Sequence, residues 1–365
     1  MRILHIMGSA DVGGIASVVY NYMSVINREK YHFDIAVNAA KKGRLETEME
    51  KMGATFYRLP KRSQGLKEYS KSLIELLDEN SFDVIHVHSN SSSFIDLRIA
   101  KKRGICCRIA HSHTALKPNS LNSLLRQLAG QCFNYYYATK IISCGKVAGD
   151  IVFGKKHMKS SKALVLPNAI PIRCFQYDQD KRSAIRKEWG LDNQYIIGMV
   201  GSFTYLKNHI FAIEMFNALQ KQCNDIKLIF VGDGEIKGEI EDYCDRNNIT
   251  DKVRFLGIRG DMERIYQGLD ILIMPSISEG FPVAGIEAIT SGLPVLLSDR
   301  ITDELKFGSH VTYLPLKKEM WIQKLQEKPI NGNRILGYKE AKENGFDIYD
   351  AVHMLEKVYD EGTYD

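Results

Sequence analysis

The segment 276–287, with the sequence SISEGFPVAGIE, carries residue types that can hold a phosphate. It directly follows the apolar run Ile271–Met274, and a helix is expected to begin near Val283. Gly280 permits a tight turn before that helix, and the unpaired amide hydrogens of a helix start attract anions. Phe281 and Val283 supply such amides, whereas Pro282 has none. We therefore expect a phosphate to bind where this helix begins.

Two glutamates lie around this helix start. Glu279 is in the loop, and Glu287 is about one turn inside the helix. Carboxylates so placed can accept hydrogen bonds from hydroxyl groups on either side of bound phosphates, and sugars and riboses present such hydroxyls. The alternative is a helix whose N-terminal acids merely complement the helix dipole.

A lysine follows an earlier strand, which is expected over Tyr195–Val200. Lys207 comes after the turn Gly201-Ser202 and is followed by Asn208. A lysine on a strand-to-helix loop is either a counter-charge for a leaving phosphate or a solvated surface charge.

A glycine pair, Gly13-Gly14, follows the first expected strand and opens a helix. Such a turn lets backbone amides approach a phosphate, although a plain tight turn is the alternative. The spacing from Gly8 fits neither the dinucleotide-binding pattern nor the Walker loop, which argues against a dehydrogenase or an NTPase.

Four histidines, His86, His88, His111 and His113, lie at the ends of expected strands. Two H-x-H pairs could suggest a metal site, but no cluster of carboxylates stands beside them, so no metal is expected. His113 is the best candidate to donate a hydrogen bond to a substrate oxygen, because Thr114 and Pro118 place it in a loop.

Short β-branched apolar runs alternate with amphipathic stretches of helical length along the whole chain. The strands are expected at Arg2–Met7, Phe33–Val37, Thr55–Arg58, Val84–His88, Cys106–Ala110, Lys140–Ser143, Ala163–Leu166, Tyr195–Val200, Lys227–Val231, Val253–Leu256, Ile271–Met274 and Pro294–Leu297. Near-continuous apolar strands separated by helices predict parallel sheets that are covered on both faces. The fold class is therefore α/β, with two doubly wound domains.

The domain boundary is expected near Pro167–Tyr177, followed by a polar linker, Gln176–Ser183, which contains an Asp-x-Asp pattern. This gives domains 1–170 and 171–346, with a last helix in 347–365 that packs back on the first domain. Ligands of open parallel sheets bind beyond the carboxyl ends of the strands. The two domains are expected to face each other across a cleft lined by these ends.

Composition restricts the class of protein. Of the 365 residues, 44% are hydrophobic and 25% are charged, as in an ordinary globular protein. No apolar run reaches the roughly 18 residues of a membrane-spanning helix, and the first residues do not resemble a signal peptide. Seven cysteines without a CxxC pair predict reduced thiols and a cytoplasmic protein.

Charge divides unevenly along the chain. Residues 1–165 hold 25 Lys and Arg against 13 Asp and Glu, and residues 166–365 hold 24 against 31. The basic clusters Lys61-Arg62, Lys101-Lys102-Arg103 and Lys155-Lys156-His157 are either solvated loop ends or a surface for anionic phospholipid or an anionic acceptor. Nucleic acid is not expected, because no aromatic residues are interleaved with these clusters.

Taken together, the segments resemble retaining glycosyltransferases of the GT-B kind, specifically glycosyltransferase family 4 and its bacterial capsule and exopolysaccharide members. Glu279 to Glu287 reproduces the E-x7-E motif of that family. The other matching pieces are Gly13-Gly14, Ala110-His111-Ser112-His113-Thr114, Leu166-Pro167-Asn168-Ala169, Gly201 through Lys207-Asn208, Val231-Gly232-Asp233-Gly234, Phe255-Leu256-Gly257 with Asp261, and Gly292-Leu293-Pro294-Val295 with Ile301-Thr302-Asp303-Glu304.

The resemblance implies two Rossmann-like domains, the first for the acceptor and the second for a sugar nucleotide, commonly UDP-linked. It implies transfer with retained anomeric configuration, no cofactor and no essential metal. The residues that it assigns to catalysis are His113, Lys207 and Glu279. The residues that it assigns to substrate binding are Gly13, Gly14, Gly201, Ser202, Arg259, Gly280, Phe281, Pro282, Val283 and Glu287.

Within that set, Glu287 would hold ribose hydroxyls and Glu279 the hydroxyls of the donor sugar. The amides around Phe281–Val283, together with Lys207, would take the diphosphate. One departure matters: the family usually has Gly-Arg where this chain has Gly201-Ser202. Either another cation such as Arg259 compensates, or donor affinity or turnover is reduced.

We expect transfer of a hexosyl group from a UDP-sugar to a hydroxyl of a glycolipid or growing polysaccharide. The leaving phosphate itself can take the proton of the acceptor. The alternatives are a non-catalytic nucleotide-sugar-binding partner subunit and a GT-B sugar-nucleotide epimerase. The basic first half and the apolar helix Leu121–Tyr137 suit peripheral contact with an anionic membrane, unless that helix faces the core.

Overall fold

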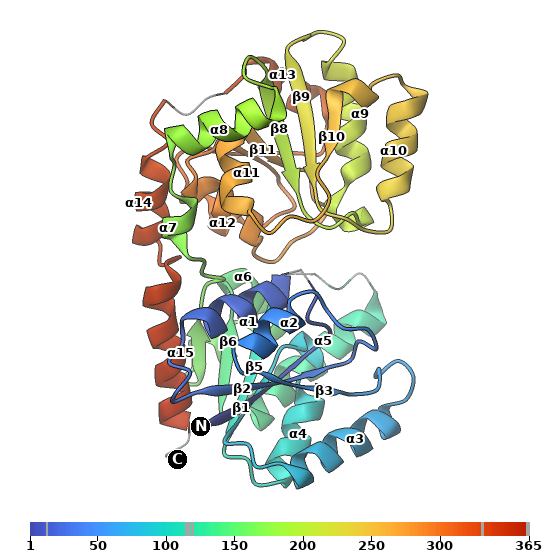
Figure 1. Ribbon diagram of the computed structural model, residues 1–365. Helices are drawn as coiled ribbons and strands as arrows, with labels where there is room; N and C mark the ends of the chain where they lie inside the picture. Colours follow the sequence, from blue (N-terminus) through green and yellow to red (C-terminus); the bar gives the residue numbers. More distant parts are fainter. Residues whose placement is uncertain (12–13, 114–117, 119, 330–331, 363–365) are drawn as a thin grey trace. The chain divides into compact units, whose positions relative to one another are not determined.

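The computed structural model describes residues 1–11, 14–113, 118, 120–329 and 332–362. The chain divides into two compact units (Figure 1). Unit 1 comprises Met1–Ala169 and Ile348–Asp365, and unit 2 comprises Ile170–Asp347. The division at Ala169 and Ile170 lies inside the stretch Pro167–Tyr177.

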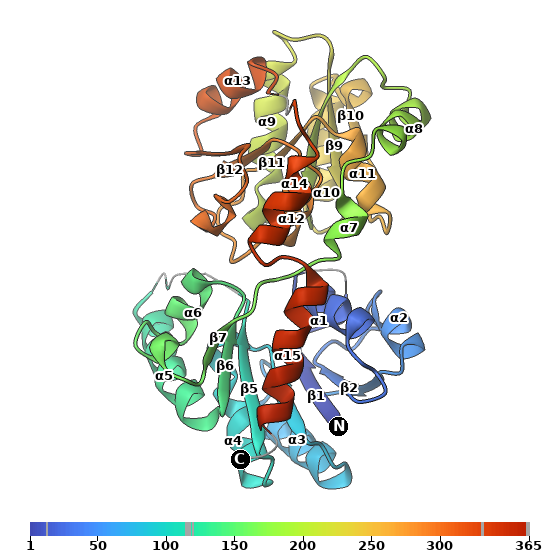
Figure 2. The ribbon, with the colours of Figure 1, turned by 90° about the vertical axis from the view of Figure 1, so that its left-hand side faces the viewer.

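Unit 1 is built on a seven-stranded parallel sheet with the order β3-β2-β1-β4-β5-β6-β7. Its strands are β1 (Arg2–Met7), β2 (His32–Val37), β3 (Thr55–Arg58), β4 (Val84–Val87), β5 (Cys107–Ser112), β6 (Lys140–Ser143) and β7 (Ala163–Val165). Its helices are α1 (Gly14–Val25), α2 (Glu46–Lys51), α3 (Leu66–Glu79), η1 (Asn90–Ser92), α4 (Phe94–Lys102), α5 (Leu121–Tyr137), α6 (Lys146–Val152), η2 (His157–Lys159) and α15 (Ile348–Gly362). Helices cover both faces of this sheet, which explains why its central strands are apolar almost throughout (Figure 2).

Unit 2 repeats this plan with a six-stranded parallel sheet of the order β10-β9-β8-β11-β12-β13. Its strands are β8 (Tyr195–Val200), β9 (Ile226–Val231), β10 (Val253–Phe255), β11 (Ile271–Met274), β12 (Val295–Ser298) and β13 (Val311–Leu314). Its helices are α7 (Ile172–Phe175), α8 (Gln179–Trp189), η3 (Tyr205–Lys207), α9 (His209–Leu219), α10 (Lys237–Arg246), η4 (Thr250–Lys252), α11 (Met262–Gly268), α12 (Val283–Thr290), η5 (Asp303–Leu305), α13 (Lys318–Gln326) and α14 (Leu336–Glu343).

In each sheet the chain order reverses between two central strands. The reversal falls between β1 and β4 in unit 1, and between β8 and β11 in unit 2. Ligands of doubly wound sheets bind beyond the carboxyl ends of the strands at such a point. The predicted fold class, two doubly wound parallel α/β domains, is confirmed.

Each unit has its own hydrophobic core. In unit 2, Met199, Phe230 and Ile273 of the sheet pack with Trp321 of α13, and all four side chains are buried. Burial of one such side chain contributes about 1.5–3 kcal/mol. Packing inside unit 2 therefore fixes β8 and β11, the strands that precede the loops of Lys207 and Glu279.

The last helix, α15, packs on unit 1 beside α1, as both ribbon views show (Figures 1 and 2). Asp360 accepts hydrogen bonds from Lys30 Nζ at 2.7 Å and from Tyr31 Oη at 2.9 Å. Tyr359 is fully buried under the sheet. The C-terminal segment therefore completes the core of unit 1.

The polar stretch Gln176–Ser183, expected to be a linker, contains the start of α8. The Asp178 side chain accepts hydrogen bonds from the amides of Asp180 and Lys181, at 2.9 and 3.0 Å. It is therefore the N-cap of this helix, and the linker prediction is wrong at this point. The Asp-x-Asp pattern, Asp178 to Asp180, is thus explained by the capping of α8.

Helix α5 exposes most of its apolar side chains, whereas Tyr135 and Tyr137 near its end pack against the core of unit 1. Along it, only Gly130 and Asn134 are buried. The exposed apolar residues are Leu121, Leu124, Leu125, Leu128, Phe133 and Tyr136. No helix in the described part of the chain is both long enough and apolar enough to cross a membrane.

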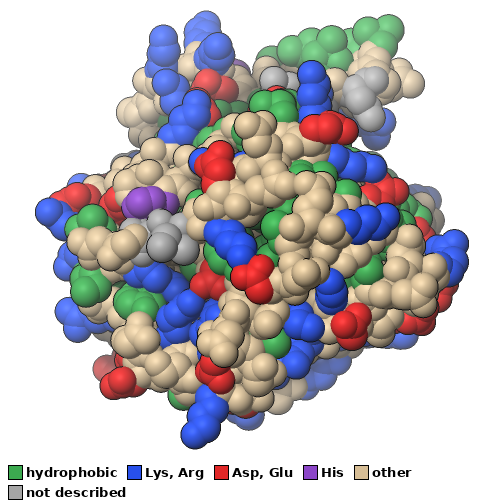
Figure 3. Space-filling view, turned by 90° about the horizontal axis from the view of Figure 1, so that it is seen from above, with side chains coloured by type: hydrophobic (Ala, Val, Ile, Leu, Met, Phe, Trp, Pro, Cys, Tyr) green, Lys and Arg blue, Asp and Glu red, His purple; other side chains and the backbone are tan. Residues whose placement is uncertain are grey.

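Charged side chains of both signs are mixed on the face that Figure 3 shows, and hydrophobic side chains gather at its upper right. Exposed ion pairs such as Lys42–Glu50 (2.5 Å) and Lys318–Glu214 (2.6 Å) join opposite charges. Such surface pairs contribute about 0–1 kcal/mol each, so the buried sheets rather than these pairs hold the fold.

Candidate functional site

Two loops of unit 2 meet at the carboxyl edge of its sheet. They follow β8 and β11, which are neighbouring strands. The amide of Ile277 donates to the Leu206 carbonyl at 2.8 Å, and Asn208 Nδ2 donates to the Pro275 carbonyl at 3.0 Å. These two hydrogen bonds hold the loop that carries the lysine against the loop that carries the first glutamate.

Lys207 and Glu279 are in direct contact. Lys207 Nζ lies 2.6 Å from Glu279 Oε2, and Ser276 Oγ donates to Glu279 Oε1 at 2.5 Å. The Glu279 side chain is 8% exposed and that of Lys207 is 24% exposed. An ammonium group has three N–H donors, so Lys207 can keep this ion pair and still bind an anion.

The turn after β8 packs against the turn after β9, and each has a glycine at the contact. A Cβ atom on Gly201 would lie 3.4 Å from Lys207 Cε, so the lysine side chain passes close over this residue. Gly232, which follows β9 and has φ of +138°, packs tightly against Gly201. A Cβ atom on Gly232 would lie 2.0 Å from the Gly201 carbonyl oxygen. Ser202, which replaces the arginine of the family pattern, is exposed.

Helix α12 begins at Val283 without a side-chain cap among the described residues. Pro282 is its N-cap, in extended conformation, and the first turn holds no acid. The Phe281 ring is buried, 5.4 Å from the Phe346 ring, and anchors the loop. Gly280 and Val283 are partly exposed. The first-turn amides of this helix are thus a suitable partner for an anion.

Glu287, one turn into α12, is paired with a tyrosine. Tyr266 Oη donates to Glu287 Oε2 at 2.8 Å. Burial raises the pKa of Glu287 to about 7, and the hydrogen bond from Tyr266 opposes this rise. Both protonation states therefore occur near neutral pH, and hydroxyl donors from a ligand would favour the ionised one.

Arg259 is held by a neighbouring acid. Its Nε and Nη2 atoms donate to Asp261 Oδ1 and Oδ2 at 2.8 and 2.7 Å, and this hydrogen bonding raises the pKa of the guanidinium. It follows β10, and β9 lies between β10 and β8. Compensation by Arg259 for the missing arginine stays a prediction.

In unit 1, His113 directly follows β5. Its Nε2 lies 2.8 Å from Nδ1 of His88, and its amide donates to Asn90 Oδ1 at 2.9 Å. Gly14 is the exposed first residue of α1. Gly13 lies outside the described residues.

Three further side chains, which were not among the predicted site residues, hold the candidate site together. Ser276 orients Glu279, Tyr266 orients Glu287, and Asn208 joins the two loops. Ser276 lies in the selected segment, and Asn208 follows the selected lysine. Tyr266 lies 21 residues before its partner on another helix, so no local pattern indicates it.

Two family models match the chain. The model described as Glycosyltransferase Family 4 matches residues 12–173, and the model described as Glycosyl transferases group 1 matches residues 181–303. Together the two matches span most of the chain, one in each half.

Curated relatives and solved structures match over nearly the whole chain. EpsF of Bacillus subtilis (strain 168) is 27% identical over 99% of this chain and 97% of its own. The capsular polysaccharide biosynthesis glycosyltransferase CapH of Staphylococcus aureus is 22% identical over 98% of each. The structure of Anabaena HepE in complex with UDP and glucose has a TM-score of 0.81 at 17% identity and covers 99% of both chains, which is evidence for a common fold.

Proposed function

From the matches to the models of Glycosyltransferase Family 4 and Glycosyl transferases group 1, we propose that the chain transfers a hexosyl group from a UDP-sugar to a glycolipid or polysaccharide hydroxyl, with retention. The observation that carries the proposal is the contact of Lys207 with Glu279 beside the uncapped start of α12. The UDP complex of HepE and the UDP-Gal in the name of an Escherichia coli galactosyltransferase, 25% identical over 82% of this chain and 79% of its own, support the donor.

The donor site lies in unit 2. The ammonium of Lys207 and the amides of Phe281 and Val283 bind the diphosphate, because they place positive charge where it is needed. Glu279 accepts hydrogen bonds from the sugar, and Glu287 from the ribose. Gly201 and Gly280 let the backbone come close to these groups.

The chemistry needs no nucleophile from the protein. The bond between the anomeric carbon and the diphosphate oxygen breaks, and the acceptor oxygen bonds to that carbon on the same face. The acceptor proton passes to the leaving phosphate. Lys207 and the helix amides, rather than a metal ion, balance the charge that develops on UDP.

Unit 1 binds the acceptor and meets an anionic membrane through α5. The exposed ring of Phe133 on α5 lies 5.4 Å from that of Phe94 on α4. Beside Phe94, a groove of about 310 Å³ between α3 and α4 is lined by apolar side chains and by Arg98, Lys102 and Arg103. Exposed apolar side chains next to cations suit an anionic phospholipid surface.

Flotation with vesicles tests the membrane contact. The full chain is expected to float with vesicles that contain anionic phospholipid at low salt, and Leu125→Glu is expected to weaken this by placing a charge on the apolar face. Ile335→Glu, on an exposed isoleucine of unit 2, is the matched control for added charge. Equal flotation of Leu125→Glu and wild type would exclude α5 as the contact.

Release of UDP tests the activity. A panel of nucleotide sugars is first screened for thermal stabilisation, since a bound ligand raises stability by mass action. The best donor is then incubated with glycolipid acceptors, and we expect wild type to release UDP and Lys207→Met to lose this strongly. Binding without turnover of any donor would instead indicate a non-catalytic partner subunit, and conversion of the sugar without acceptor an epimerase.

A further inference from the structure

A buried tyrosine of unit 2 reaches from α11 to one of the two acids of the candidate site. Tyr266 lies in the last turn of α11, and its side chain is fully buried. Its Oη donates to Glu287 Oε2 at 2.8 Å, and the Ala284 carbonyl lies 3.3 Å away. Both acceptors belong to α12 and are about one turn apart. The phenol is therefore directed at the helix that carries the acid.

The position of this hydroxyl is fixed from two sides. The Tyr266 ring contacts the Phe175 ring of α7, with 6.0 Å between the ring centres. Arg334 Nη2 donates to the Tyr266 carbonyl at 3.0 Å, and Arg334 Nε donates to the carbonyl of Ser291, the C-cap of α12, also at 3.0 Å. One guanidinium thus joins the ends of the two helices that carry Tyr266 and Glu287.

Among the described residues, only one carboxylate oxygen of Glu287 has a hydrogen-bond donor. Tyr266 bonds to Oε2, and Oε1 accepts no hydrogen bond from them. An ionised carboxylate is an acceptor only, whereas the protonated form carries an O–H group and has less acceptor capacity. Two neighbouring ribose hydroxyls that both donate therefore need the ionised form. The phenol donor also bonds more strongly to this form, because its oxygens carry the negative charge.

Two groups of α11 have opposite effects on the protonation of Glu287. Burial raises the pKa of Glu287 to about 7, the hydrogen bond from Tyr266 lowers it, and the negative charge of Glu263 raises it. Helices α7 and α14 and strand β12 also pack against α12. In the described part of the chain, the titratable side chains of these three elements form no hydrogen bond or ion pair with Glu287. They are Arg173, Cys174, Tyr338, Lys339, Glu340, Lys342 and Glu343.

We propose that Tyr266 is a positioning residue, whose hydroxyl donates to Glu287 Oε2 and so keeps this carboxylate an acceptor for the hydroxyls of a ribose. The proposal rests on the proposed function, which assigns Glu287 to the ribose of UDP. Tyr266 itself touches no substrate. Its effect passes through Glu287, because the ionised carboxylate is more stable with the phenol donor than without it.

Tyr266→Phe removes the hydroxyl and leaves the ring. Because the lost hydrogen bond favours the ionised form, we expect the pKa of Glu287 to rise by about one pH unit. Carbon-13 NMR of the full chain, labelled at Cδ of glutamate, reads this pKa directly, and the Glu287 signal is assigned by its loss in Glu287→Gln. The titration needs no ligand, so failure of the Tyr266 contact is distinguished from failure of the chain to bind UDP, which would count against the proposed function.

UDP affinity at two pH values gives the second readout. A higher pKa leaves a smaller fraction of Glu287 ionised. Calorimetry should therefore find UDP bound by Tyr266→Phe about fivefold more weakly than by wild type near pH 7, and less than about twofold more weakly near pH 8.5. Titration of the UDP phosphate cancels in this ratio of variant to wild type. A merely structural role of Tyr266 would give the same ratio at both pH values.

Two controls isolate the path through Glu287. In the Glu287→Gln background no carboxyl titrates at this position, so adding Tyr266→Phe should give equal ratios at the two pH values. Tyr195→Phe removes the hydroxyl of another buried tyrosine of unit 2, which donates to the Pro329 carbonyl at 2.8 Å. It should leave the pH dependence of UDP binding as in wild type.

Three results would overturn the proposal. They are an unchanged pKa of Glu287 in Tyr266→Phe, an equal loss of UDP affinity at both pH values, and a pH-dependent loss that persists in the Glu287→Gln background or appears in Tyr195→Phe. Should Tyr266→Phe not fold, the wild-type titration still decides. A Glu287 carboxyl that stays protonated above about pH 8 is not kept as an acceptor, and this result would also overturn the proposal.

Discussion

Variants of Lys207 and Glu279 measure what their ion pair contributes to the free energy of unfolding and, in a separate assay, to UDP binding. Glu279 is almost buried and its other oxygen is bonded to Ser276, whereas a quarter of Lys207 reaches solvent. Lys207→Met leaves a buried carboxylate without its cation, so we expect the free energy of unfolding to fall by about 2–3 kcal/mol. Glu279→Gln leaves an ammonium that water can reach, so the free energy of unfolding should fall by only about 0.5–1.5 kcal/mol.

The double variant Lys207→Met/Glu279→Gln completes the cycle. Because no uncompensated charge remains, we expect it to be less destabilised than the two single losses combined, with a coupling of about 1–2 kcal/mol. Urea unfolding of the four proteins measures this. Additive losses within about 0.5 kcal/mol would mean that the contact is absent in solution.

Binding of UDP to the same four proteins tests the functional assignment. If Lys207 holds the diphosphate, Lys207→Met loses a charge-assisted hydrogen bond worth about 1.5–3 kcal/mol, which weakens UDP roughly 10- to 150-fold. Glu279→Gln should bind UDP about as well as wild type, because the proposed partner of Glu279 is the sugar, which UDP lacks. Calorimetry at low salt measures both. Unchanged UDP affinity of folded Lys207→Met would refute the assignment.

Three further predictions concern the fold and the second acid. Burial raises the pKa of Glu287 to about 7, and ribose hydroxyls would favour its ionised form, so UDP affinity should rise between about pH 5.5 and 8. Calorimetry should show that Glu287→Gln removes this rise. Gly232→Ala should lower the free energy of unfolding by about 1–3 kcal/mol or more, from its positive φ and its clash with Gly201, whereas Gly238→Ala in α10, where a Cβ has open space, should be neutral or stabilising; equal urea midpoints would contradict this. Asp178→Ala should cost about 1 kcal/mol through loss of the N-cap of α8, and an unchanged thermal midpoint would argue against the cap.

Five strands were predicted to the residue, and all but the edge strand β3 have a mostly buried apolar run. The bounds expected for Arg2–Met7, Thr55–Arg58, Lys140–Ser143, Tyr195–Val200 and Ile271–Met274 are those of β1, β3, β6, β8 and β11. Polar or turn-forming residues next to these runs mark where pairing stops. Since the sheets are parallel, the regions between strands had to hold crossover helices.

Elements without an apolar signature were missed. Strand β13 (Val311–Leu314) lies at a sheet edge and is partly exposed along its length, so it lacks a buried run. Helix α8 begins in a charged stretch, and its start depends on a cap that looks like linker sequence. In both cases the tertiary position, rather than the local pattern, decides the structure.

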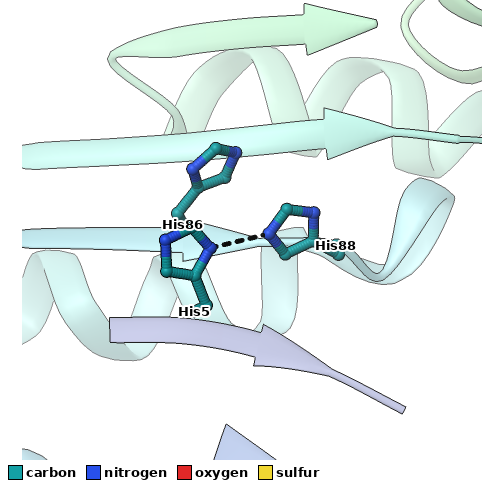
Figure 4. Close-up of side chains that lie close together, drawn as sticks. All are labelled: His5, His86 and His88. Carbon is teal, nitrogen blue, oxygen red and sulfur yellow. Dashed lines mark hydrogen bonds between the residues drawn. The ribbon is translucent and has the colours of Figure 1, made fainter. Parts of the chain in front are cut away.

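Lys207 and Glu279 were selected as candidates from the sequence, but their contact with each other was not predicted. Lys207 and Glu279 are 72 residues apart, and they meet only because β8 and β11 are neighbours in the sheet. The histidines were noticed as H-x-H pairs, yet the contacts of the His88 ring with His5 (Figure 4) and with His113 depend on the register of β1, β4 and β5. Which residues of neighbouring strands pair with each other could not be predicted from a single sequence.

A crystal structure of the full chain with UDP tests the central claim most directly, because it locates the phosphates. We expect the diphosphate within about 3 Å of Lys207 Nζ and of the Val283 amide, with a ribose hydroxyl on Glu287. A nucleotide bound in unit 2 away from the start of α12, or one bound only to unit 1, would contradict it.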